Sequence, residues 1–312
     1  MNVETGRYVV VTLCEGTYWH GTTVLFNSLY NSGFRGTFCI GYRGTIPTWF
    51  QRAAYAFTSG SKSSGVEFRY VQVSGKRHMT NLKPDFMIDI IKNESLKDSD
   101  AIFYFDPDIV NKCNWTFYQD WVQNGIALCE DINSPLYSRG PMKEAWRKFY
   151  HFENFPTQQP IDAYFNGGFV GAKVSYVRFL ETWRRLQNSA VEAGVNLENW
   201  NMSAGTRNDL FYRVDQDFLN VAAMLHPDIV SPIGKEGMDF IFGGQVMSHA
   251  IGSSKPWNTN YLRQVLRGFR PRQADHLYWK SAKWPFSAHS APRRWRSSTE
   301  LKIAAALGRI IA

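Results

Sequence analysis

The chain has 312 residues, 44% of them hydrophobic, which suits one large α/β domain with an extension or two domains. Its four cysteines form no C-x-x-C pair, and no apolar run approaches the roughly 18 residues that span a bilayer, so we expect a cytoplasmic protein without structural disulfides or spanning helices. The net charge of +8 lies in residues 261–312, where eleven Lys or Arg oppose two acids to give +9; the remainder of the chain carries −1.

Apolar, β-branched runs alternate with helical patterns over the first third of the chain. The runs predict strands at 7–14, 37–42, 66–73 and 101–105, and the patterns between them predict helices at 22–33 and 83–93. Strands that alternate with helices indicate a mostly parallel sheet in an α/β fold. The first 16 residues lack the basic and apolar segments of a signal peptide, which agrees with a cytoplasmic location.

The second half of the chain is less regular. Strands are predicted at 125–131 and 163–173, and helices at 141–152, 174–189, 215–226 and 299–312. From these elements and the charge distribution we expect a catalytic domain over residues 1–260. A basic, aromatic extension, helical or irregular, is expected over residues 261–312.

The strand at 101–105 ends in two carboxylates, Asp106 and Asp108, on either side of a proline. Asp and Pro are common turn residues, so the triplet alone also fits an ordinary strand end. Two carboxylates this close repel unless a cation lies between them. Ligands of open α/β sheets bind beyond the carboxyl ends of the strands, and carboxylate oxygens suit Mg²⁺ or Mn²⁺ that holds phosphates.

Three further motifs follow "YFDPD" (104–108): "FNGG" (165–168), "DQDFLN" (215–220) and "HAIGSSKPW" (249–257). Each alone fits a turn, a charged helix start or a loop. Together, and in this order, they resemble the metal-dependent glycosyltransferases of the GT-A fold, above all glycosyltransferase family 8, the group of glycogenin and of lipopolysaccharide galactosyl- and glucosyltransferases. Two stretches depart from that pattern: Ala250 stands where an aromatic is usual, and "TLCEGTYWHG" replaces the usual uracil loop.

The resemblance implies a GT-A, Rossmann-like fold and a divalent cation, Mn²⁺ or Mg²⁺, with a UDP-sugar donor. Asp106, Asp108 and His249 are the implied metal ligands, and a mixed oxygen and nitrogen set favours Mn²⁺. Lys255 is expected to bind the pyrophosphate, while Gly252 lets the backbone approach it closely.

The resemblance also suggests donor contacts from the N-terminal half. Tyr18 is the candidate for stacking on the base, and Thr12 for a polar contact with it. Lys83 resembles a basic residue that touches the donor sugar or phosphate, although a lysine at a helix start is usually solvated.

At the sugar, the resemblance implies catalytic roles for Asn166, Asp215, Gln216 and Asp217. Asp215 is expected to hold donor hydroxyls, and Asp217 to do the same or to bind the acceptor. The implied transfer retains the anomeric configuration, either through a covalent intermediate or by attack on the face that the diphosphate leaves. Gln216 is a poor nucleophile, which favours the same-face route.

The basic extension over residues 261–312, called the tail below, suggests where the acceptor is found. Trp and Arg with apolar side chains suit a membrane interface, and in the predicted helix at 299–312 Ile303, Leu307, Ile310 and Ile311 share one face. The alternative is that this helix packs on the body. We therefore expect a glycan or glycolipid acceptor, with peripheral contact at the inner face of a membrane. No nucleic acid partner is expected, because no binding motif is present and the body is not basic.

Two other functions remain open at this stage. A nucleotidyltransferase shares the sheet, the metal and the basic residues, but the sequence lacks a Gly-rich, basic triphosphate loop after the first strand. A non-catalytic nucleotide-sugar binder is the other alternative, and the intact acids and His249 argue against it.

Overall fold

The computed structural model describes residues 7–59, 65–93, 96–150, 160–198 and 210–311 and divides the chain into two compact units. Unit 1 consists of Met1–Leu13, Val73–Phe105 and Phe117–Lys235. Unit 2 consists of Cys14–Gln72, Asp106–Thr116 and Glu236–Ala312. The Asp106–Asp108 motif therefore opens a segment of unit 2, directly after the last residue of a unit 1 strand.

The sheet of unit 1 has the strand order β1-β4-β7-β6-β8. The pairs β1–β4 and β6–β8 are parallel, while β7 runs antiparallel to both of its neighbours. Because β7 is reversed, its first residues lie beside the carboxyl end of β6, where Glu130 pairs with Phe165. The strands are β1 (Tyr8–Glu15), β4 (Ala101–Phe105), β6 (Ile126–Glu130), β7 (Phe165–Lys173) and β8 (Val230–Ile233).

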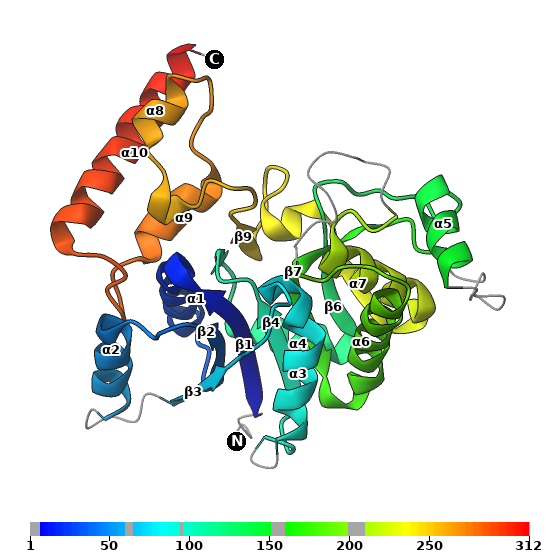
Figure 1. The fold of residues 1–312 in the computed structure, drawn as a ribbon. Helices are drawn as coiled ribbons and strands as arrows, with labels where there is room; N and C mark the ends of the chain where they lie inside the picture. Colours follow the sequence, from blue (N-terminus) through cyan, green and yellow to red (C-terminus); the bar gives the residue numbers. More distant parts are fainter. Residues whose placement is uncertain (1–6, 60–64, 94–95, 151–159, 199–209, 312) are drawn as a thin grey trace. The chain divides into compact units, whose positions relative to one another are not determined.

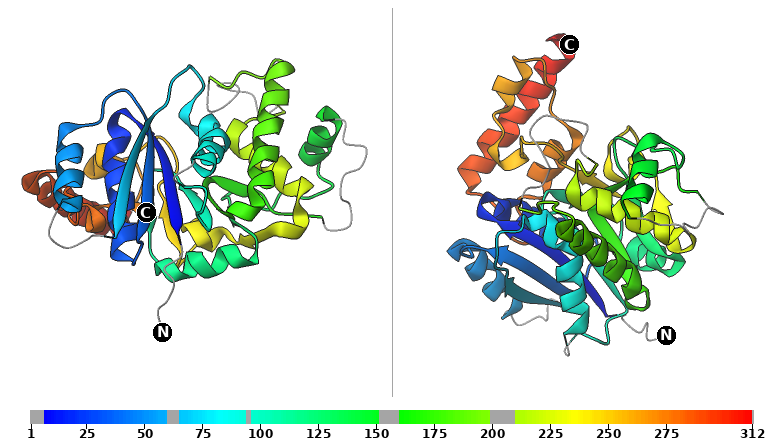
Figure 2. Two further views of the ribbon diagram at one scale, coloured as in Figure 1. Left: turned by 90° about the horizontal axis from the view of Figure 1, so that it is seen from below. Right: turned by 45° about the vertical axis from the view of Figure 1, so that its right-hand side comes forward.

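Amphipathic helices accompany this sheet, and α6 packs against both α3 and α7 (Figures 1 and 2). In α6 the apolar residues recur at helical spacing and form a buried face that includes Trp183 and Leu186, whereas α7 is buried on all sides from Val214 to Met224. The helices are α3 (Lys83–Lys92), α4 (Trp115–Trp121), α5 (Pro141–Phe149), α6 (Val177–Glu192) and α7 (Val214–Leu225).

Unit 2 contains a parallel pair, β2–β3, and a short antiparallel pair, β5–β9. Helix α1 packs against β5, and helices α8 and α9 both contact α10 (Figure 1). The strands are β2 (Gly36–Arg43), β3 (Val66–Gln72), β5 (Ile109–Asn111) and β9 (Met247–His249). The helices are α1 (Trp19–Asn31), α2 (Thr48–Thr58), α8 (Tyr261–Val265), α9 (Gln273–Ser281) and α10 (Ala291–Ile311).

The predicted α/β class and its mostly parallel pairing are confirmed, since β1–β4, β2–β3 and β6–β8 all run parallel. Strands β1 and β4 are largely apolar and buried, as expected where both faces of a parallel sheet are covered, whereas β3 and β8 are mostly half-buried or exposed. In β4, for example, all five residues are buried.

The segment 261–312 shares a hydrophobic core with other parts of unit 2. Tyr261, Tyr278 and Leu301 from this segment pack with Val24 of α1 and Trp257. Part of the segment 261–312 therefore packs on the rest of unit 2.

The apolar face predicted for the C-terminal helix is divided in the structure. Leu307 packs on the core, whereas Ile303 and Ile310 are exposed. The Ile311 side chain lies outside the part of the chain that the structure describes. Among the described residues, no helix is both long enough and apolar enough to cross a bilayer.

Candidate functional site

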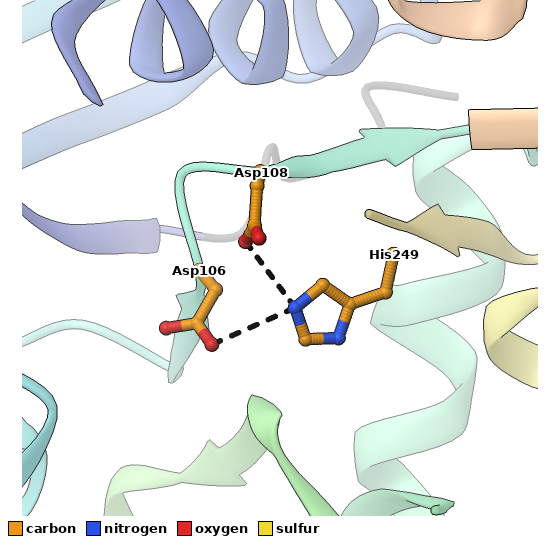
Figure 3. Close-up of side chains that lie close together, drawn as sticks. All are labelled: Asp106, Asp108 and His249. Carbon is orange, nitrogen blue, oxygen red and sulfur yellow. Dashed lines mark ion pairs between the residues drawn. The ribbon is translucent and has the colours of Figure 1, made fainter. Parts of the chain in front are cut away.

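Asp106, Asp108 and His249, the trio that the family resemblance implies, converge in unit 2 (Figure 3). His249 Nε2 lies 3.2 Å from Asp108 Oδ1 and 3.8 Å from Asp106 Oδ2. One ligand atom from each residue falls within 4.8 Å of the others, and no other trio of His, Cys, Asp or Glu in the described part of the chain meets that condition. Two carboxylates and one imidazole fit a divalent cation such as Mn²⁺.

Backbone pairing builds this arrangement. The turn after β4 closes with a bond from the Ile109 amide to the Asp106 carbonyl, at 3.1 Å. In the β5–β9 pair Ile109 lies opposite His249, and the Ala250 amide donates to the Asp108 carbonyl, also at 3.1 Å. The register of two three-residue strands therefore sets the position of the imidazole relative to the carboxylates.

Lys255 completes a charged group around Asp108. Its ammonium donates to Asp108 Oδ2 and, at 2.9 Å, to the Ala250 carbonyl. Burial raises the pKa of the Asp108 carboxyl, but Lys255 and His249 lower it by more, so this pKa lies well below its usual value. The pKa of Lys255 is raised overall: burial lowers it, and Asp108, Tyr18 and Asp106 together more than offset this. Both groups are therefore charged at neutral pH.

Tyr18 lies beside Lys255, whose ammonium is 5.9 Å from the centre of the tyrosine ring. The ring of Trp257 meets it edge-on, with centroids 5.3 Å apart, and Trp257 is itself buried. The pKa of Tyr18 is raised, mainly by burial. Stacking of Tyr18 on a nucleobase stays a prediction.

Gly252 and Thr12, two predicted donor contacts, are not members of the charged group around Asp108. Gly252 has φ +89° with open space where a Cβ would be, so the turn after β9 needs a glycine for its conformation. Thr12 lies within β1 and is fully buried, and the described residues offer its hydroxyl no hydrogen-bond partner. A contact from either residue to the donor stays a prediction.

Gly21 is a residue that the motifs do not reveal. A Cβ on Gly21, inside α1, would lie 2.3 Å from the Pro107 carbonyl oxygen and 2.7 Å from Trp257 Cη2. Helix α1 therefore approaches the turn between the two aspartates with no room for a side chain. The helix predicted from the sequence begins at residue 22, three residues after the observed start at Trp19, so no sequence signal marks this close approach.

A second polar cluster lies in unit 1, around Lys83. This lysine is 1% exposed, and its ammonium donates to Asp215 Oδ2 at 2.7 Å and to the Gly167 carbonyl at 2.8 Å. A solvated helix-start lysine, the ordinary alternative, does not describe this geometry. Lys83 instead joins the start of α7 to the "FNGG" strand.

Helix α7 also holds the backbone of β7 through two side-chain amides. Gln216 Oε1 accepts a hydrogen bond from the Gly167 amide at 3.1 Å. Asn220 bonds both backbone groups of Phe165, accepting from its amide at 2.7 Å and donating to its carbonyl at 2.8 Å. The spacing D-Q-D-x-x-N therefore places two amides one helical turn apart on the strand that begins "FNGG".

Asn166 is oriented by Asp131, a residue that the sequence motifs missed. Asn166 Nδ2 donates to Asp131 Oδ2 at 2.6 Å, and Arg213 Nη1 lies 3.7 Å from the same oxygen. Asp131 follows β6 and Asn166 is the second residue of β7, so the antiparallel register brings them together. The Asp131 side chain is fully buried.

Asp217 is enclosed by protein groups. Tyr164 Oη donates to Asp217 Oδ1 at 2.5 Å, and the Arg213 amide donates to Oδ2 at 2.9 Å. Burial raises the pKa of Asp217 to about 7, although the hydrogen bond from Tyr164 opposes this.

The structure thus brings Lys83, Asp215 and Gln216 together at Gly167, while Asp217 is bonded to Tyr164 and Arg213. Sugar contacts from any of them stay predictions.

Comparison with known proteins identifies the fold of this chain but no sequence family. No protein-family model and no curated protein matches the sequence. The structure is similar to the WbbM bifunctional glycosyltransferase, with a TM-score of 0.58 and 15% identity over 96% of this chain and 53% of that chain. It is similar to the glycosyltransferase GlyE of Streptococcus pneumoniae TIGR4, with a TM-score of 0.55 and 16% identity over 95% of this chain and 64% of that chain.

The fold is that of these glycosyltransferases. This chain spans 53% to 64% of the length of the two structures. At this level of identity the likeness extends to the fold alone, so activity, donor and acceptor must be argued from the residues.

Proposed function

We propose that the protein is a Mn²⁺-dependent glycosyltransferase that moves a hexose from a UDP-sugar to a glycan or glycolipid acceptor. The observation that carries this proposal is the Asp106, Asp108 and His249 trio beside the Lys255 ammonium, in a chain with a glycosyltransferase fold. Carboxylates, an imidazole and a nearby lysine are the groups that a metal-bound diphosphate requires.

The residues of unit 2 have defined roles in this proposal. Asp106, Asp108 and His249 hold the cation, which when bound neutralises the negative charge of the departing diphosphate. Lys255 adds a positive charge to the same diphosphate from a loop whose conformation depends on Gly252. Because Lys255 also bonds the Ala250 carbonyl, its ammonium is held close to the metal ligands.

The residues of unit 1 are assigned to the donor sugar. Asp215 accepts from sugar hydroxyls while Lys83 holds its carboxylate in place and compensates its charge. Asn166 and Gln216 present amides whose positions are set by Asp131 and by the Gly167 backbone. Preorganised polar groups of this kind lose little freedom when substrate binds.

We propose retention of the anomeric configuration by attack on the face that the diphosphate leaves. Gln216 carries an amide, which is a weak nucleophile, and its carbonyl already accepts the Gly167 amide. Asp217 has both carboxylate oxygens in hydrogen bonds to protein groups. In this route the leaving phosphate takes the acceptor proton, so no strong protein base is required.

The test begins with thermal unfolding in the presence of UDP, GDP, CMP or ATP, each with and without Mn²⁺. A ligand that binds only the folded state raises the unfolding temperature. The expected result is a shift for UDP that requires Mn²⁺, followed by Mn²⁺-dependent hydrolysis of a UDP-sugar. Asp108→Asn should abolish both effects in a folded protein, whereas Asp98→Asn, at a side chain that is 69% exposed, should change neither.

Two results would contradict the proposal. A shift with ATP, with release of pyrophosphate on turnover, would identify a nucleotidyltransferase. A Mn²⁺-dependent UDP shift without turnover of any UDP-sugar, in the presence of glycan and glycolipid acceptors, would identify a binding protein.

A further inference from the structure

Helix α10 presents an exposed apolar stripe on the face opposite to its packed side. Trp295 is 73% exposed, Ile303 47% and Ile310 81%. At about 100° per residue these three side chains, Ala306 and the half-buried Thr299 fall within a sector of about 80°. We call the four apolar residues among them the outer face of α10. Leu301, Ala304 and Gly308 lie on the other side of the helix and are buried.

The packed side of α10 makes the outer face a preformed surface. Leu301 and Ala304 belong to the core that α8 and α9 share. A Cβ on Gly308 would come within 3.4 Å of Val265 in α8, so the two helices approach closely near the end of α10 (Figure 1). The helix therefore needs no folding on contact, and its outer face spans about 22 Å from Trp295 to Ile310.

Cationic side chains border this apolar stripe. Lys302 and Arg309 lie along one edge and Arg296 along the other, and all three are exposed. Both acids of the tail are engaged elsewhere: Asp275 with Arg272, and Glu300 with the Leu262 amide. Glu300 follows Arg296 by one helical turn, and in the described part of the chain no ion pair joins an acid to Lys302 or Arg309.

We propose that the outer face of α10 docks on an anionic lipid bilayer. A tryptophan and aliphatic side chains bordered by Lys and Arg form the pattern of a helix that lies in the membrane interface. Acidic headgroups supply the negative charge that the tail lacks, and each cation near such a surface strengthens binding. This docking is independent of the transferase activity; where both hold, it brings the enzyme to a lipid-linked acceptor.

Vesicle co-sedimentation tests the docking directly. The full chain is mixed with vesicles of phosphatidylcholine alone or with about 30% phosphatidylglycerol, at low salt and at about 0.5 M NaCl, where charges are screened beyond a few Å. The expected result is binding to the anionic vesicles only, reduced at high salt.

Two variants and one control locate the surface. Trp295→Ser/Ile303→Ser/Ile310→Ser should weaken binding at least about tenfold, because the apolar contact is lost. Lys302→Glu/Arg309→Glu changes only exposed side chains and should weaken it by a similar factor, which keeps the test valid if the triple variant fails to fold. Tyr55→Ser/Tyr137→Ser/Phe242→Ser removes exposed rings elsewhere and should bind as the parent does; these rings are 75%, 64% and 105% exposed.

Several results would overturn the proposal. They are no binding to anionic vesicles, an undiminished affinity in the charge variant, and an equal loss in the control variant. Tight, salt-sensitive binding of single-stranded RNA without vesicle binding would show that the basic surface serves another partner. The UDP shift with Mn²⁺ is measured separately, so failure of docking and failure of the transferase proposal are distinguishable.

Discussion

His249 Nε2 lies 3.2 Å from Asp108 Oδ1, and the backbone enforces this contact. The Asp108 carbonyl accepts the Ala250 amide while Ile109 pairs with His249, so both side chains project from one two-stranded ladder. The candidate metal centre is thus held by a β5–β9 pair that brings together residues far apart in sequence.

His249→Ala should lower Mn²⁺ affinity by more than about tenfold, since the site then keeps only the two carboxylates. Electron paramagnetic resonance of free Mn²⁺ in a titration measures this affinity. His276→Ala, in α9, provides the matched control and should leave the affinity unchanged. Equal affinities for the parent and His249→Ala would remove the imidazole from the ligand set.

Gly21→Ala should destabilise the protein by about 1–3 kcal/mol, because the new methyl group overlaps a carbonyl oxygen and an indole ring. A glycine to alanine change in an open helix has the opposite sign, by up to about 1 kcal/mol. Urea unfolding measures the free energy change, and a Mn²⁺ titration shows whether the turn between Asp106 and Asp108 has moved.

Gly308→Ala is the control for that change. Its nearest neighbour would be Arg270 Cγ at 3.0 Å, part of a flexible side chain that can shift. It should therefore be close to neutral. Equal effects of the two substitutions would mean that α1 does not constrain the turn.

Much of this architecture follows from local sequence. The run Ala101–Phe105 is apolar and ends at Asp106, so both the strand and its position before the carboxylates could be predicted. Helices α3, α6 and α7 also follow from local signals: a proline near the first turn of α3, an amphipathic pattern in α6 and acids in the first turn of α7. The motif that contains His249 could be paired with the aspartates only by resemblance, because nothing local indicates that the two segments meet.

Other features depend on tertiary structure and leave little trace in sequence. Asp131 has no motif of its own; it meets Asn166 only because β6 and β7 pair antiparallel. Strands β5 and β9 have three residues each, too few for a periodic pattern. The tail helix begins at Ala291, ahead of the predicted start at residue 299, because a proline suits the first turn of a helix.

Lys83→Met should destabilise unit 1 strongly, by about 3–5 kcal/mol, because the Asp215 carboxylate would stay buried without its cation. The double variant Lys83→Met/Asp215→Asn removes both charges and should recover much of this loss. The free energies of the two single variants and the double variant form a cycle that isolates the coupling.

Lys92→Met is the matched surface control for that cycle. Lys92 pairs with Glu181 at 3.1 Å, with side chains 57% and 38% exposed, so the loss should stay within about 0.5 kcal/mol. If Lys83→Met costs no more than this control, Lys83 and Asp215 do not form a buried pair in solution.

The raised pKa of Asp217 makes stability depend on pH. Its pKa is about 7 in the folded protein against an ordinary value of 3.8 for an aspartate, so between these values the folded state holds a proton that the unfolded state has released. Unfolding then releases a proton, and stability falls as pH rises from about 4 to about 7. The full effect of this group is about 4 kcal/mol, at 1.36 kcal/mol for each unit of pKa.

Asp217→Asn isolates this contribution, because an amide stays neutral at every pH; it still accepts the Tyr164 hydroxyl but loses the bond from the Arg213 amide. The lost bond is the same at every pH, so the stability of the variant relative to the parent should rise from pH 4 to pH 8. Asp228→Asn, at an exposed aspartate of the same unit, should follow the parent at every pH. Urea unfolding across this range measures all three proteins, and parallel curves for the parent and Asp217→Asn would show that Asp217 titrates alike in the folded and unfolded states.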